Sequence, residues 1–591
     1  MRAYSAKRSN PLFSNKRADL IFIGGLFYKV RIYYSFFIVP GKQPRKSDIR
    51  FEKIAAATGK TTDMYLSLLD IFVIVLYLVV IAAVAHYLSP NEDESEDGVE
   101  HKGSLDNTLR KRTLPWWVIG TSLIAANISA EQIIGMSGSA YAFGLAIASY
   151  EWMAALALLL VGKYVLPIFL QNGIRTMPEF LRRRFGKRIQ VTMAILWLGL
   201  YVFVNLTAVL WLGATAVHTV TGLTMITSLI LLGLFAGNYA LYVGLKPASA
   251  TDVVQVSMLV LGGLVIVYIA IERISGGSGI AGFAGGLDIL AKRLPDHFHM
   301  ILAPDNPYYK YAPGLAMVLG GMWVVNLCYW GFNQYVIQRT LTAESIHEAQ
   351  KGVVFAAFLK LLIPVLVVLP GIAAVVLVNH IERPDEAYPM LMTLLPNGLL
   401  GFVFVALVAA IISSMGSTLS SIAAIFSRDV LKAVNEKAGD RLLTISGRFA
   451  AIAALLVAMV AAIPLLGHVD QAYQYIQEFT GFITPGVLTI FVVGLFWKRG
   501  TEAGAVAAAA VSLIGSVAFK LALPLVPFID RIGYVFLICV GTAILVSFAQ
   551  KPKPQSESVD IAGVDFSTGA VYNIGALTVL AILAAIYAVW W

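Results

Sequence analysis

The stretch Ser122–Ser139, which reads SLIAANISAEQIIGMSGS, decides the fold of this 591-residue chain. It lies in a long apolar segment, yet it carries an asparagine, a glutamate, a glutamine, several serines and two glycines three residues apart. A continuous lipid-facing helix tolerates such groups poorly, because hydrocarbon offers polar atoms no hydrogen-bond partner. We therefore predict a helix unwound near Asn127, with free carbonyl groups available to a cation. Packing of small residues on a neighbouring helix is the alternative, but it leaves the adjacent Glu131 and Gln132 unexplained.

The rest of the sequence has the composition of a membrane protein. Hydrophobic residues make up 58% of the chain and charged residues only 13%, which excludes a disordered chain and argues against an ordinary cytosolic enzyme. Cys328 and Cys539 lie far apart in apolar stretches, so no disulfide framework is expected. Long apolar runs predict an all-α integral membrane protein with about fourteen spans rather than a barrel. They lie near 66–88, 116–145, 146–171, 189–220, 223–243, 253–273, 314–338, 352–379, 398–426, 443–466, 473–496, 502–524, 532–549 and 570–591.

The basic character of the chain belongs wholly to its first 63 residues. They hold 13 Lys/Arg and 4 Asp/Glu, which accounts for the entire net charge of +9. The apolar run 20–28 is too short to span a bilayer, and Met64 is followed almost at once by a good span. We interpret 1–63 as a basic extension in front of the true start at Met64; a disordered basic tail is the alternative.

Lysine and arginine in the short loops predict the orientation. Alternate loops, beginning with 89–115 and 172–188, carry most of the basic residues, and basic loops stay cytoplasmic. Both ends of the membrane unit are therefore expected outside. The long loop 274–313, which is rich in Gly, Asp, His and Pro, is expected to form an ordered external cap.

Polar residues at membrane depth are the candidates for function. Glu151 begins the third span, where an interfacial position is the alternative, and Lys360 lies inside the eighth, from which it could instead snorkel to the cytoplasmic edge. The segment Asn326–Tyr335 interleaves amides with aromatic rings, a combination that suits a sugar, although an interfacial aromatic belt is also conceivable. Tyr473 and Gln477 share one helix face.

Two further groups are weaker candidates taken alone. The carbonyl of Ala410 lies beside the hydroxyl of Ser414 one helical turn later, and Ser413 is adjacent, so oxygen atoms suited to a small hard cation cluster there. Such serines more often bond back to their own helix. Asp252 opens the sixth span near the cytoplasmic side, where a carboxylate also favours a helix N-terminus.

The sequence lacks the motifs of other function classes. It has no GxxxxGK[ST] loop for nucleotide phosphates, no nucleophile triad and no metal-ligand spacing. Any pumping must therefore run on an ion gradient, and we expect neither an enzyme, a nucleic-acid-binding protein nor a sodium-linked sensor.

Six stretches resemble the sodium/solute symporter family, most closely its bacterial sodium/galactose branch, within a similarity that covers most of 114–550. They are Leu114–Trp117, Ala126–Gln132, Ser149–Met153, Asn326–Arg339, Phe355–Pro370 and Gln474–Thr480. The resemblance implies two inverted five-helix repeats with discontinuous helices, at 116–273 and 314–496. The segment 64–115 would precede the first repeat, 274–313 would link the two, and additional helices in 497–591 would follow.

The resemblance also implies roles for particular residues. Sugar would bind Gln132, Glu151, Asn326, Lys360 and Gln477. Tyr329, held by Asn127, would form the inner gate, and Met136, Tyr150 and Tyr473 would close the outer side. Sodium would be held by the carbonyls of Ala125, Ile128 and Ala410 and the hydroxyls of Ser413 and Ser414, and Asp252 would lie on its exit path.

The sequence thus predicts sodium-coupled uptake of a galactose- or glucose-like hexose across the cell (inner) membrane by alternating access. A symporter of another polyol or organic solute, such as inositol or a carboxylate, is the alternative. Expected partners are sodium, the sugar and membrane lipid, and the expected state is a monomer or weak homo-oligomer. The sodium/galactose branch is similar at Glu151–Met153 but continues with a sugar-binding serine where this chain has Ala154, which could shift sugar preference.

Overall fold

The computed structural model describes residues 65–87, 115–174, 176–243, 249–341, 343–378, 380–550, 561 and 563–591. The chain divides into two units, Met1–Asp63 and Met64–Trp591. The first unit, and with it our interpretation of the true start, lies outside the described residues. The second unit is a helical bundle, and every regular element in its described part is a helix.

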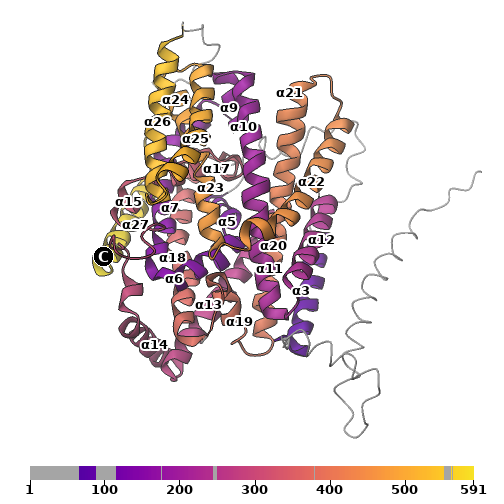
Figure 1. The fold of residues 1–591 in the computed structure, drawn as a ribbon, viewed down its shortest axis with the longest axis vertical. Helices are drawn as coiled ribbons and strands as arrows, with labels where there is room; N and C mark the ends of the chain where they lie inside the picture. The colour runs from indigo at the N-terminus through magenta and orange to yellow at the C-terminus, as the bar shows by residue number, and fades with distance from the viewer. Residues whose placement is uncertain are drawn as a thin grey trace, which may run out of the picture. The chain divides into compact units, whose positions relative to one another are not determined.

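The helices follow the apolar segments of the sequence (Figure 1). The α-helices are α3 (Leu68–Tyr87), α5 (Trp116–Asn127), α6 (Met136–Phe143), α7 (Ser149–Leu160), α8 (Leu166–Gln171), α9 (Met177–Arg184), α10 (Lys187–Leu200), α11 (Thr207–Thr221), α12 (Met225–Val243), α13 (Ser249–Ser275), α14 (Gly279–Arg293), α15 (Leu315–Leu319), α16 (Met322–Phe332), α17 (Gln334–Leu341), α18 (Ile346–Leu377), α19 (Ala387–Met392), α20 (Leu399–Ala424), α21 (Lys432–Val434), α22 (Asp440–Leu466), α23 (Ala472–Thr480), α24 (Thr484–Phe496), α25 (Glu502–Ala522), α26 (Phe528–Phe548) and α27 (Ala570–Val589). Short 3₁₀ and π segments are η3 (Glu131–Gly135), η4 (Gly144–Ala148), η5 (Val161–Val165), η6 (Tyr201–Leu206), η7 (Pro295–Phe298), η8 (Pro384–Glu386) and η9 (Ile425–Leu431).

Eleven helical runs in the described part of the chain are long and apolar enough to cross a membrane. Three shorter apolar helices, 68–80, 116–125 and 225–238, fall on three other expected spans. The expected total of about fourteen spans stays a prediction, since a span made of broken or short helices does not meet a criterion based on helix length.

The second span is interrupted where the sequence predicted it. Helix α5 ends at Asn127, and Ile128 has an extended backbone (φ −71°, ψ 110°) before the π-helix η3 begins at Glu131. In the gap, the hydroxyl of Ser129 accepts a hydrogen bond of 3.2 Å from the backbone N–H of Glu131. The side-chain oxygen thus replaces the carbonyl acceptor that a continuous helix would have offered to this N–H group. The prediction of an unwound helix near Asn127 is confirmed.

Other spans are also discontinuous. The seventh breaks at Asn333 (φ −81°, ψ 122°), between α16 and α17, and the eleventh breaks between α23 and α24. Between the second and third spans the helical backbone is interrupted at Gly144, whose φ of +74° lies in a region that glycine adopts readily. The backbone of His297 lies so close that a Cβ at Gly144 would meet its carbonyl oxygen at 2.2 Å.

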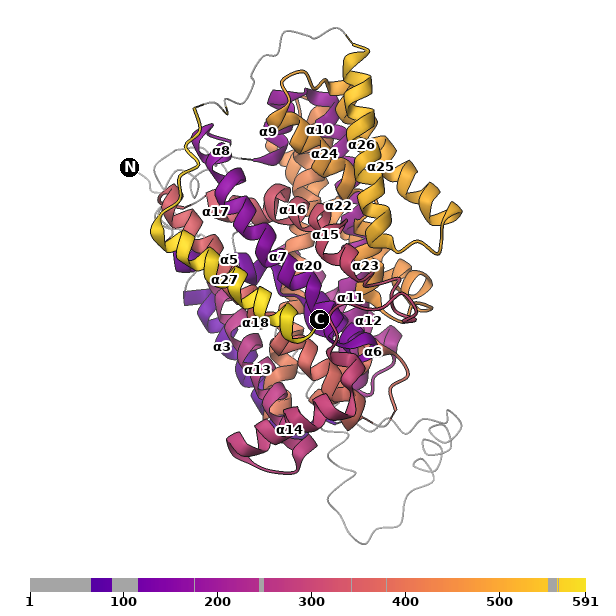
Figure 2. The same ribbon diagram turned by 90° about the vertical axis from the view of Figure 1, so that its left-hand side faces the viewer.

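Two of the basic segments that the structure describes lie at one end of the helical bundle. Helix α9, which carries Arg182–Arg184, and α21 lie at the end opposite α14 in Figure 1, and Figure 2 again places α9 and α14 at opposite ends. This arrangement agrees with alternating cytoplasmic and external loops. The predicted external loop 274–313 contains the helices α14 and η7. Figure 2 also shows α27 lying obliquely across α18.

Helix α3 is joined to the start of α20 through the buried Asp70. Its Oδ1 accepts hydrogen bonds from the backbone N–H groups of Gly398 (2.6 Å) and Gly401 (2.8 Å), and its Oδ2 accepts from Ser67. A carboxylate there satisfies N–H groups that the first turn of α20 leaves unpaired.

We expect Asp70→Ala to lower the unfolding free energy by about 1–3 kcal/mol, because two buried N–H groups would lose their acceptor. Thermal unfolding in detergent measures this, and Asp70→Asn, which retains one acceptor oxygen, should lose less. Equal melting temperatures for all three proteins would show that α3 does not depend on this contact.

Candidate functional site

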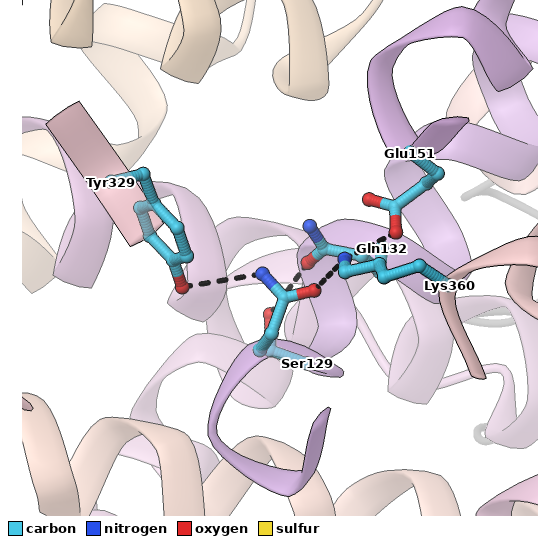
Figure 3. Close-up of polar contacts among 6 residues, drawn as sticks. Ser129, Gln132, Glu151, Tyr329 and Lys360 are labelled. Atoms are coloured by element: carbon cyan, nitrogen blue, oxygen red, sulfur yellow. Dashed lines mark hydrogen bonds and ion pairs between the residues drawn. The ribbon is translucent and has the colours of Figure 1, made fainter. Parts of the chain in front are cut away.

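The ammonium group of Lys360 is the centre of a buried polar cluster in mid-bundle (Figure 3). Lys360 lies on α18, and its side chain is only 1% exposed. Its Nζ pairs with Oε2 of Glu151 on α7 and donates to Oδ1 of Asn127 at the end of α5. The same Nζ lies 5.0 Å from the ring centre of Trp330 on α16. Lys360 therefore has a partner within the protein and does not snorkel to the membrane edge.

Asn127 connects Lys360 to Tyr329. The amide Oδ1 of Asn127 accepts from Lys360, and its Nδ2 donates to the hydroxyl of Tyr329 over 3.2 Å. Asn127 can serve both partners because α5 ends there, which turns its side chain into the bundle interior. The break in the second span and the polar cluster are thus one feature of the structure.

Gln132 lies beside Lys360 in Figure 3, on the helix that resumes after the break. Its Oε1 is 3.5 Å from the hydroxyl of Ser129, the outer limit for a hydrogen bond, and only 7% of the residue is exposed. Amide donors, a carboxylate and an ammonium group next to aromatic rings can bind a polyhydroxylated molecule, because hydroxyls both donate and accept.

The predicted outer residues form a packed layer. The rings of Tyr150 and Tyr473 are in edge contact with centroids 5.7 Å apart, and Met136 is fully buried. The hydroxyl of Tyr150 contacts the backbone carbonyl of Tyr311 at 2.9 Å and the amide oxygen of Gln474 at 3.4 Å. Tyr311 belongs to the long loop after α14, so this layer separates the cluster from that loop.

Three residues of this layer were missed by the sequence analysis. Ser139 donates to Oε1 of Gln471 (2.9 Å) and accepts from Nε2 of Gln474 (3.2 Å), which joins α6 to the start of α23. All three are buried. The only sequence signal was a pair of glutamines beside Tyr473, and glutamines at a helix start are common in surface positions too.

Two predicted sugar ligands, Asn326 and Gln477, form side-chain hydrogen bonds within their own helices. The amide of Asn326 donates to the carbonyl of Met322 in its own helix over 3.1 Å. Gln477 is half-buried and has a side-chain hydrogen bond with Tyr473, one turn earlier on α23. Their roles as sugar ligands stay predictions.

The predicted sodium ligands lie on α20 and at the broken end of α5. Ser413 is buried and Ser414 is half-buried, and the carbonyl of Ser414 accepts from Thr418 at 2.9 Å. Ile128 lies in the unwound stretch and has an extended backbone, so its carbonyl is not part of a regular helix. Carbonyl and hydroxyl oxygens suit a hard monovalent ion, and the ligand set stays a prediction. Asp252 falls within α13, but its side chain is not among those that the structure describes.

An all-helical, multi-pass bundle with broken spans around a buried polar cluster defines a secondary transporter. The sodium:solute symporter family model matches residues 108–512, and the chain belongs to this family. Its members are transporters, as the sequence analysis expected, and not enzymes. The sodium coupling that the family name states also agrees with the expected coupling ion.

Named relatives support the same assignment. The chain is 44% identical over 549 residues to a sodium/glucose cotransporter of Vibrio parahaemolyticus, which covers 89% of this chain and 99% of the relative. It is 29% identical over 473 residues to sodium/glucose cotransporter 1 of Ovis aries (74% and 69% covered). It is 31% identical over 468 residues to sodium/myo-inositol cotransporter 2 of Mus musculus (74% and 67% covered).

The fold is also that of a solved transporter. A substrate-bound, outward-open Na⁺-coupled sialic acid symporter superposes with a TM-score of 0.68 at 20% identity, over 83% of this chain and 99% of that one. At this identity the likeness concerns the fold alone. It confirms the predicted fold class of an all-helical membrane bundle with discontinuous helices.

Proposed function

We propose that this protein couples the entry of sodium to the uptake of a galactose- or glucose-like hexose by alternating access. The observation that carries the proposal is the buried Lys360–Glu151–Asn127 cluster at the break of the second span. Charged side chains this deep in a membrane bundle are costly and rare, and those that occur mark functional sites. The 44% identity to a sodium/glucose cotransporter over nearly the whole chain supports a sugar as the cargo.

The charge of the cluster favours a neutral substrate over a carboxylate. Because Glu151 pairs with Lys360, the ammonium group offers little net positive charge to an anion. The more similar relative is a sodium/glucose cotransporter, which favours a sugar over inositol, a neutral polyol that another relative's name states. Sugar hydroxyls would exchange hydrogen bonds with the predicted ligands while an apolar sugar face meets an aromatic ring. These ligands are Gln132, Glu151, Asn326, Lys360 and Gln477.

The outer side of the cluster is closed in the structure. The layer of Tyr150, Tyr473 and Met136 is closed, whereas Tyr329 on the other side of the cluster is half-buried. Sodium held between α5 and α20 would stabilise the outward-open form and complete the sugar pocket, since it would fix the unwound end of α5. A ligand shifts such an equilibrium only by its differential affinity for the two states, and the coupling is reciprocal.

After binding, Tyr329 would swing aside, sodium would leave past Asp252, and the sugar would follow. The membrane potential would contribute about 2.3 kcal/mol per charge moved through 100 mV. Exposed apolar side chains on α3, α22 and α27 would face lipid in the inner membrane. We propose a monomer or weak homo-oligomer as the working unit.

Uptake of a sugar panel into proteoliposomes tests the function. We expect an inward sodium gradient to drive accumulation of a hexose, and potassium in place of sodium to give only equilibration. Inositol should be included as a competing solute. If sodium changes the uptake of no sugar or polyol in the panel, the proposed function is wrong.

Gln477→Ala is expected to weaken sugar binding with little change in the sodium affinity measured alone. One lost hydrogen bond is worth about 0.5–1.5 kcal/mol, which raises the KM for sugar roughly two- to tenfold. The exposed Gln550 provides the matched control, Gln550→Ala. Normal kinetics for every sugar transported would remove Gln477 from the pocket.

A further inference from the structure

A three-residue segment of the loop between α18 and α20 holds both sides of the corner that joins α22 to α23. At its first residue, the guanidinium of Arg383 donates to the carbonyls of Leu466 (2.9 Å) and Val469, just where α22 ends. A cation is favoured at a helix C-terminus because the last carbonyls are unpaired. Arg383 also lies 4.8 Å from the ring centre of Trp211 on α11, which fixes its position.

The last residue of the segment, Asp385, holds the other side of the corner. Its Oδ2 accepts a hydrogen bond of 2.8 Å from the backbone N–H of Ala472, the first residue of α23. A carboxylate at this position caps the helix and complements its dipole. Asp385 is fully buried, and its Oδ1 has no hydrogen-bond partner among the described residues.

The outer half of the second span packs against the same segment. A Cβ added at Gly138 on α6 would lie 2.8 Å from the carbonyl of Pro384, so glycine is required for this approach. One residue further, Ser139 bonds Gln471 and Gln474 of the α22–α23 corner. Helices α6 and α23 therefore meet at Pro384–Asp385, next to the hydrogen bonds of Ser139.

We propose that Asp385 is a positioning residue that holds α23 against α6 in the outward-closed form and releases α23 when the outer side opens. The inference deepens the proposed function, since α23 carries Tyr473 and Gln477, and it rests on that function for its meaning in transport. Asp385 acts through the backbone of Ala472 and does not touch the sugar.

Burial gives this contact a pH dependence. Removal from water raises the pKa of the Asp385 carboxyl to about 7, the Ala472 N–H and Arg383 oppose the rise, and Glu386 and Asp470 add to it. If opening exposes the carboxyl, its pKa falls back toward 3.8. The group binds a proton more tightly in the closed form, so acidification stabilises that form. Between pH 8 and pH 6 the closed-to-open ratio should rise about tenfold.

Thiol labelling can measure the opening directly. The native Cys328 and Cys539 are buried, so background reaction is low, and Ala472→Cys places a thiol at a fully buried position beside the contact. A membrane-impermeant maleimide, applied from outside without sugar or sodium, reports exposure of this thiol. Asp385→Ala is then added to the Ala472→Cys protein. At pH 6 the thiol of this double variant should react about two- to thirtyfold faster than the thiol of the Ala472→Cys parent, which is the range expected for loss of a helix N-cap.

Asp385→Asn distinguishes the effect of the hydrogen bond to Ala472 from the effect of protonation, because asparagine keeps an acceptor oxygen but binds no proton. The labelling rate of the parent, divided by that of Asp385→Asn at the same pH, should fall about tenfold from pH 8 to pH 6. The exposed Asp288→Ala on α14 is the control and should match the parent. The proposal is overturned if Asp385→Ala labels no faster than this control, or if the ratio is constant with pH. Because no sugar is present, labelling decides the proposal even if uptake experiments were to refute sodium-coupled sugar transport.

Discussion

Replacing Lys360 with alanine should abolish sodium-driven sugar uptake and destabilise the fold. The substitution would leave Glu151 as a buried carboxylate without its cation, and breaking a buried pair on one side costs about 3–5 kcal/mol. It would also remove the donor that holds Asn127 at the end of α5. Thermal unfolding in detergent and uptake into proteoliposomes measure the two effects.

The double variant Lys360→Gln with Glu151→Gln separates stability from transport. Because two neutral amides can bond each other, most of the lost stability should return, whereas transport should not, since the sugar loses both charged partners. The exposed pair Lys292–Asp288 supplies the control, because Lys292→Ala should cost less than about 1 kcal/mol. If Lys360→Ala melts and transports like Lys292→Ala, the buried cluster has no role in either.

Replacing Ser414 with alanine should remove the sodium stimulation of uptake while the protein stays folded. A hydrogen bond or contact to a charged group is worth about 1.5–3 kcal/mol, so the sodium concentration for half-maximal stimulation should rise roughly ten- to a hundredfold. At ordinary sodium concentrations stimulation would then disappear. Sodium titration of uptake, with melting temperature as a test of folding, measures the change.

Ser417→Ala is the matched control for this change. Ser417 lies on the same helix, α20, but its side chain is exposed, so sodium dependence should be unaffected. Coupling adds a second readout, because weaker sodium binding lowers the sodium occupancy at a fixed sodium concentration and therefore also lowers the apparent affinity for sugar. An unchanged sodium dependence in Ser414→Ala would remove this residue from the ion site.

The sequence alone predicted the spans and the interruption of the second one. Both follow from a local rule: hydrocarbon rejects unpaired polar groups, so a stretch such as Asn127–Gln132 cannot continue as a lipid-facing helix whatever surrounds it. The break after Asn333 was not foreseen, although the segment was noted for its amides. Aromatic residues around it kept the composition apolar enough for an unbroken span.

The pairing of the polar residues was decided by tertiary structure alone. The sequence placed Lys360 and Glu151 at membrane depth but left snorkelling and an interfacial position open, and only the packing of α18 on α5 and α7 brought the two charges together. Asp385 lies in a loop of ordinary composition, and nothing local marks it as the cap of α23. The bilayer acts on each residue separately, so apolar composition shows which residues lie at membrane depth. The partner of a buried polar residue depends instead on contacts between segments hundreds of residues apart.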